Sequence, residues 1–94
     1  MRLKNEFELV ELMDENLLVP VGDERDKFLG VVALNDVSAR LLREMKDKDQ
    51  TIEKLADIMF QEYDVDYEVL RQDMCEHIRE LNEMGVLAGW EENA

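Results

Sequence analysis

The chain has 94 residues, of which 24 are acidic and 11 basic, and its formal net charge at pH 7 is −13. This length fits one small domain. The charge argues against nucleic acids as partners, because phosphate binding requires clustered Lys and Arg, and against anionic membranes. The single cysteine, Cys75, cannot form an internal disulfide, and no apolar stretch approaches the roughly 20 residues of a membrane-spanning helix. We therefore expect a protein of a reducing compartment, the cytoplasm.

The first third of the sequence predicts strands. Alternating apolar residues predict a strand over residues 7–13, and the sequence DEN at 14–16 predicts a turn. A second strand is expected over residues 17–21, where Pro20 is typical of a strand end or a sheet edge.

A third strand is predicted for the stretch FLGVVAL, residues 28–34, which follows a polar loop and has no charged or polar side chain. Successive side chains of a strand point to opposite faces, so both faces of this strand are apolar. The two sets are Phe28, Gly30, Val32 and Leu34, and Leu29, Val31 and Ala33. We expect the fold to cover one of these faces.

The remaining two thirds predict three helices. Asn35, Thr51 and Asp66 are suitable N-caps for them, and breaks at residues 46–50 and 63–66 separate them. Apolar residues follow each cap at helical spacing, and the third helix is expected to run to about Met84, with Gly85 as its stop.

The order of these elements predicts an α+β fold, in which a three-stranded antiparallel sheet is followed by a three-helix bundle in a winged-helix-like shape. We expect a single domain over residues 1–94, with an ordered core at about 5–88 and a short C-terminal tail.

The residue types present offer no catalytic set. His77 is the only histidine, and Cys75 lies two positions before it, so the two side chains would not face each other on a helix. The sequence around Asp64 and Asp66 lacks the Gly and the terminal Glu of a calcium loop, and helix capping explains these two residues better. We therefore expect a protein that is not an enzyme and that has no metal site and no cofactor.

A winged helix can also bind DNA, with its second and third helices as a helix-turn-helix. The acidic charge argues against that reading, and an acidic winged-helix shape is better suited to binding a peptide. A regulatory or structural subunit that acts through protein contacts remains the alternative.

Several short motifs occur at or near the starts of the three predicted helices and along the third helix. Leu34 and Asn35 open the first helix, Thr51 and Ile52 open the second, and YDVD at 63–66 precedes the third. The third helix then carries the pattern DM…I..L...GVL, from Asp73 to Leu87. Over about residues 5–88 the sequence thereby resembles the PqqD family. Its members are small peptide-binding proteins of pyrroloquinoline quinone biosynthesis, with relatives that recognise other ribosomally made, post-translationally modified precursor peptides.

Two positions depart from the family pattern. Tyr67 follows Asp66 where the family often has Pro or an acidic residue, and His77 stands where a large aromatic or aliphatic residue is common. Both lie on or near the expected binding groove, so the preferred peptide is expected to differ from that of the quinone pathway.

The resemblance implies a peptide chaperone without catalytic activity. The leader of a precursor peptide would add as a strand to the third strand, beside the third helix, and would be presented to a modifying enzyme, often a radical S-adenosylmethionine enzyme. The implied binding residues are Leu29, Gly30, Val31, Val32 and Ala33 on the strand, and Leu70, Arg71, Met74, His77 and Ile78 on the helix. Arg71 would pair with an acidic leader side chain, and the exposed strand edge would also allow a homodimer.

Overall fold

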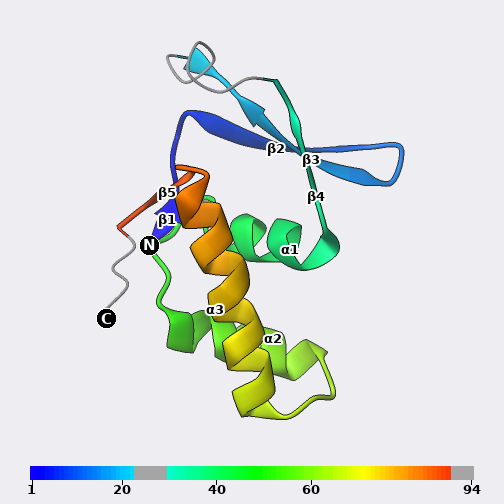
Figure 1. The fold of residues 1–94 in the computed structure, drawn as a ribbon, viewed down its shortest axis with the longest axis vertical. Helices are drawn as coiled ribbons and strands as arrows, with labels where there is room; N and C mark the ends of the chain where they lie inside the picture. The colour runs from blue at the N-terminus through cyan, green and yellow to red at the C-terminus, as the bar shows by residue number, and fades with distance from the viewer. Residues whose placement is uncertain (23–29, 90–94) are drawn as a thin grey trace.

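The computed structural model describes residues 1–22 and 30–89. Its elements, in chain order, are β1 (Arg2–Leu3), β2 (Phe7–Leu12), β3 (Glu15–Pro20), β4 (Val32–Leu34), α1 (Asp36–Glu44), α2 (Ile52–Glu62), α3 (Tyr67–Glu83) and β5 (Leu87–Ala88). Strands β2, β3 and β4 form an antiparallel sheet in that spatial order. Figure 1 shows this sheet at one end of the molecule, with α1 beside it and α2 at the far end. The predicted α+β fold is confirmed.

The turn between β2 and β3 is shorter than predicted. Met13 and Asp14 both have positive φ, 51° and 67°, and Leu12 pairs directly with Glu15. Two central residues with positive φ form the tight hairpin turn whose twist matches that of the flanking strands. The turn expected at 14–16 is therefore wrong, since β3 begins at Glu15. Met13 is unusual at such a position, and its side chain is 89% exposed.

Cross-strand pairing sorts the sheet residues into two faces. Val10 pairs with Leu17, which pairs with Ala33, and this row lies on the outer face of the sheet. Leu9, Leu18 and Val32 form the adjacent row, which faces the helices. β4 is shorter than the strand predicted over 28–34, because Gly30 and Val31 lie outside it and residues 28 and 29 lie outside the described part of the chain.

All three predicted N-caps are confirmed. The side chain of Asn35 accepts a hydrogen bond from the backbone N–H of Ser38 at 2.8 Å, and Thr51 accepts one from Lys54 at 3.1 Å. Asp66 accepts from the backbone N–H groups of Glu68 and Val69, at 3.0 Å and 3.3 Å, in the first turn of α3. These bonds satisfy donors that have no partner within the helix, so each cap fixes where its helix begins.

Gly85 ends α3, as predicted. Its φ is +81°, a left-handed conformation that suits glycine, and its N–H donates to the carbonyl of Asn82 at 2.9 Å. The chain then turns back along the domain, and β5 pairs with β1 through Leu87 and Leu3.

The core joins the inner face of the sheet to all three helices. Its fully buried side chains include Leu18 of β3, Leu41 and Leu42 of α1, Leu55 and Met59 of α2, and Met74, Ile78 and Leu81 of α3. Among the described residues, no helix combines the length and the apolar character needed to cross a membrane.

Candidate functional site

The outer edge of β4 is open in the described part of the chain. β4 pairs with β3 through Val32, Ala33 and Leu34, and none of the described strands pairs with its other edge. The N–H of Val31, just before β4, donates to no backbone carbonyl among residues 1–22 and 30–89. An unpaired strand edge offers backbone donors and acceptors to a further strand. Residues 31–34 are all uncharged, so no charged side chain opposes such pairing here.

The fold covers one face of this strand. Val32 and Leu34 are partly buried and pack against the core, whereas Ala33 is exposed and Val31 is 54% exposed. The alternation predicted for these four residues is therefore confirmed, and the outer face of β4 remains open to solvent.

An apolar cavity of about 180 Å³, which we call the α3 pocket, lies where α1, α2 and α3 meet. Seven of its lining residues are apolar and two, Asp73 and His77, are polar. The full set is Val37, Met59, Tyr63, Val65, Val69, Leu70, Asp73, Met74 and His77. Val37 lies three residues after the end of β4, so the pocket lies close to the end of the open strand edge.

The residues expected on the third helix fall into three groups. Leu70, Met74 and His77 line the α3 pocket. Ile78 has no exposed surface and belongs to the core. Arg71 does not line the pocket, and its Nη2 lies 3.5 Å from Oε1 of Glu53 on α2. On the strand side, Val31, Val32 and Ala33 lie at the open edge, Gly30 precedes it with φ +82°, and Leu29 lies outside the described residues.

His77 connects α3 to α1. Its Nδ1 shares a hydrogen bond of 3.2 Å with the hydroxyl oxygen of Ser38, at the start of α1. The histidine therefore helps to fix the wall of the pocket next to the end of β4. No group of three potential metal-ligating side chains occurs among the described residues.

Arg40 holds α1 against the end of α2. Its Nε donates to Oε2 of Glu62 at 3.3 Å, and its other guanidinium nitrogens contact Glu62 and Glu44. These hydrogen bonds, with Glu62 first and Glu44 second, raise the pKa of Arg40 above its ordinary value. The same bond from Arg40 lowers the pKa of Glu62. Glu62 directly precedes Tyr63, so this ion pair fixes the α2 side of the pocket.

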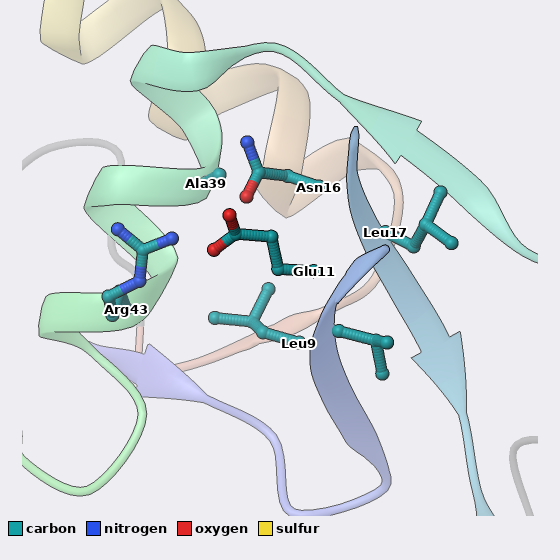
Figure 2. A pocket seen from close by; sticks show the side chains of 7 residues that line it. Leu9, Glu11, Asn16, Leu17, Ala39 and Arg43 are labelled. Atoms are coloured by element: carbon teal, nitrogen blue, oxygen red, sulfur yellow. The ribbon is translucent and has the colours of Figure 1, made fainter. Parts of the chain in front are cut away.

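A second cavity, of about 230 Å³, lies between the β2–β3 hairpin and α1. We call it the hairpin pocket. Figure 2 shows the side chains of Glu11 and Arg43 reaching into it, with Asn16 beside them. Asn16 donates to Asp36 at 3.2 Å. The remaining lining residues are Leu9, Val10, Leu17 and Ala39. None of the residues that line it belongs to β4 or α3, so it is separate from the α3 pocket.

Six residues of the α3 pocket were not expected at the site from the sequence, namely Val37, Met59, Tyr63, Val65, Val69 and Asp73. A signal for three of them was present. Tyr63, Val65 and Val69 are large apolar residues on or next to a helix break, and each is at least 40% exposed. Apolar residues outside the buried helical stripes mark a surface that is available to a partner.

The fold and this geometry define a small winged-helix-like domain with an open strand edge beside an apolar pocket. Sites of this kind bind extended peptides. The profile of the family described as "Coenzyme PQQ synthesis protein D (PqqD)" matches residues 9–87, and the chain belongs to the PqqD family. The resemblance seen in the sequence is thereby confirmed.

Two solved structures are similar to this fold. The structure of TbiB1 in complex with the TbiA(beta) leader peptide has a TM-score of 0.73 and 22% sequence identity, over 98% of this chain and 100% of that chain. A lasso peptide synthetase B1 complexed with the leader peptide has a TM-score of 0.69 and 22% identity, over 90% of this chain and 93% of that chain. No curated protein matches the sequence significantly.

Proposed function

We propose that this protein binds the leader segment of a ribosomally made precursor peptide and holds it for a modifying enzyme. The observation that carries the proposal is the open, uncharged edge of β4 that ends beside the apolar α3 pocket. The two similar solved structures, each a complex with a leader peptide, support the same reading, as does membership of the PqqD family.

The dimensions fit a short extended peptide. At about 3.3 Å per residue, the four residues from Val31 to Leu34 offer an edge of about 13 Å. Val37 of the α3 pocket lies three residues further on, which is at most about 10 Å of chain. A leader segment of roughly seven extended residues would therefore pair with β4 and reach the pocket with one side chain.

The energetics suit a carrier that later releases its cargo. Each main-chain hydrogen bond to β4 would contribute about 0.5–1.5 kcal/mol, and one apolar side chain buried in the pocket about 1.5–3 kcal/mol. The ordering of a flexible peptide opposes these gains. A few hydrogen bonds and one buried side chain, opposed by this ordering, would hold the leader at a high effective concentration near the enzyme and still let the leader dissociate.

In this proposal the protein carries out no chemistry, and the modifying enzyme does. The family resemblance makes a radical S-adenosylmethionine enzyme the first enzyme to test, in the cytoplasm. The same strand edge could pair with a second copy of the chain, so a homodimer would compete with the leader for one set of hydrogen bonds.

The test is an amide NMR titration of the labelled protein with synthetic leaders of short peptides encoded beside its gene. We expect shifts at residues 31–34 and at the α3 residues that line the pocket. Shifts confined to β2 and the hairpin pocket would overturn the site. No shift with any of these leaders would overturn the function, and an electrophoretic shift with DNA would then favour a regulator.

A further inference from the structure

We propose that the leader bound at this site carries a Lys or Arg beside the apolar side chain that enters the α3 pocket, and that Asp73 selects it. The inference rests on the proposed function and adds the charge of the peptide to it. It reverses the expectation that Arg71 pairs with an acidic leader residue.

Asp73 is exposed and occupies the middle of a row of side chains along α3. Val69, Asp73 and His77 are spaced four residues apart, so they share one helix face, and all three line the α3 pocket. Of the described residues that line the pocket, Asp73 alone has a carboxylate. Its side chain makes no hydrogen bond or ion pair within the described part of the chain, so its charge is available to a bound peptide.

Two arginines of the surrounding helices already have acidic partners. Arg40 contacts both Glu44 and Glu62, and Arg71 lies 3.5 Å from Glu53. No Lys or Arg among residues 1–22 and 30–89 lines the pocket. An acidic leader side chain would therefore meet Asp73 and find no unpaired cation on the pocket wall.

A long basic side chain matches both parts of this surface. Val65 is 46% exposed and Val69 is 54% exposed, next to Asp73. Lys and Arg can lay their methylene groups along such apolar surface and still place the charge at a carboxylate. The net charge of −13 would attract a basic peptide and repel an acidic one, which acts in the same direction.

The experiment selects peptides from a display library of random sequences about ten residues long, which suffices to span the edge and the pocket. Selections at low ionic strength use the wild-type protein, Asp73→Asn, Asp73→Lys and the matched control Asp57→Asn. Asp57 is exposed on α2 and does not line the pocket, but its substitution changes the net charge by the same amount. We expect Lys and Arg to be enriched at one position with the wild type and the control. This enrichment should disappear with Asp73→Asn and turn to Asp and Glu with Asp73→Lys.

One selected peptide then gives the size of the effect. Replacing its basic residue by Gln should weaken binding to the wild type about two- to five-fold, as for an exposed ion pair, and should have no effect with Asp73→Asn. Added salt should reduce the difference.

The outcomes separate the two proposals. Selected peptides that lose affinity for Val31→Pro but show no basic preference would overturn the charge inference and leave the function standing. If no selected peptide is sensitive to Val31→Pro, strand addition fails, and the charge inference fails with it.

Discussion

The two edges of the same sheet differ in charge. β2 carries Glu8 and Glu11 within its six residues, whereas residues 31–34 along β4 carry no charge. Both strands pair with β3 alone among the described strands. Charged side chains on an edge strand discourage pairing with another chain. The comparison indicates that the sequence protects one edge of the sheet and leaves the other available.

The surroundings of the two edges differ in the same sense. Beside β2, the hairpin pocket contains Glu11 and Arg43, two charged side chains that a partner would have to desolvate (Figure 2). At the end of β4, the α3 pocket has a mainly apolar wall. Extended peptides are bound where a backbone edge and an apolar pocket coincide, and of these two described edges β4 is the one that offers both.

The largest effect is expected from removing the support that both edges share. Leu18 lies in the central strand β3 and is fully buried. Leu18→Ala should lower the free energy of unfolding by about 2–5 kcal/mol, because it leaves a cavity in the core. Urea unfolding followed by circular dichroism measures this loss. A cost below 1 kcal/mol, on the order of a surface change, would contradict the assigned core.

The next largest effect is expected from a substitution that blocks the open edge of β4. Val31→Pro removes an N–H that has no backbone acceptor in the described structure, so stability should change little. Leader binding should weaken by about 1–3 kcal/mol, roughly five- to 150-fold, because a carbonyl of the peptide loses its donor. Calorimetric titration with a leader that shifts the NMR spectrum measures the change.

Val31→Ala is the matched control, since it shortens the same side chain and keeps the N–H. A loss of affinity as large as that of Val31→Pro would assign the effect to the side chain instead of the strand pairing. Unchanged affinity in a folded Val31→Pro protein would rule out strand addition to β4.

A third effect is expected when the charged side chains on the edge strand β2 are removed. The double substitution Glu8→Val and Glu11→Val makes this edge as uncharged as β4. When the β2 strands of two copies pair, opposed glutamates would repel each other by about 0.2–1 kcal/mol per pair. The double variant lacks this repulsion, so its self-association should rise with protein concentration. Sedimentation velocity measures it, with Asp57→Asn as a control for altered net charge. A double variant as monomeric as the wild type would show that other features close the β2 edge.

The smallest effect concerns Arg40 and the pocket wall. Because the folded-state pKa of Glu62 is lowered, the stability from this pair is present above the ordinary carboxylate pKa and is lost as pH falls through the lowered value. Arg40→Met should therefore reduce stability at neutral pH, and its difference from the wild type should shrink at strongly acidic pH. Thermal unfolding over a pH series measures this, and a difference independent of pH would contradict the ion pair as its cause.

Local patterns made the helices predictable. Asn35, Thr51 and Asp66 each combine a capping side chain with an apolar stripe behind it, and both signals depend on residues within a few positions. The alternation of Val31 to Leu34 likewise follows from strand geometry alone. The order of the elements then indicated the α+β fold, and the PqqD resemblance implied the peptide site between the third strand and the third helix.

Features that depend on distant contacts could not be read from the sequence. The β1–β5 pair joins residues at opposite ends of the chain, and strands of two residues have no periodicity to detect. The turn at Met13 and Asp14 is set by the register of β2 on β3, which shifts the expected turn by one residue. The α3 pocket draws residues from three helices, so Asp73 becomes part of its wall only through packing.

Under the proposed function, the row of Val10, Leu17 and Ala33 on the outer face has a consequence for the modifying enzyme. A strand added to β4 would lengthen this row by one residue, since alternate side chains of any strand point to opposite faces. Half of the leader side chains would then face the helices, and the other half would stand beside Val31 and Ala33 in solvent. The loaded domain would thus display a wider surface than the empty one, and an enzyme that contacts this face would distinguish a carrier with cargo from one without.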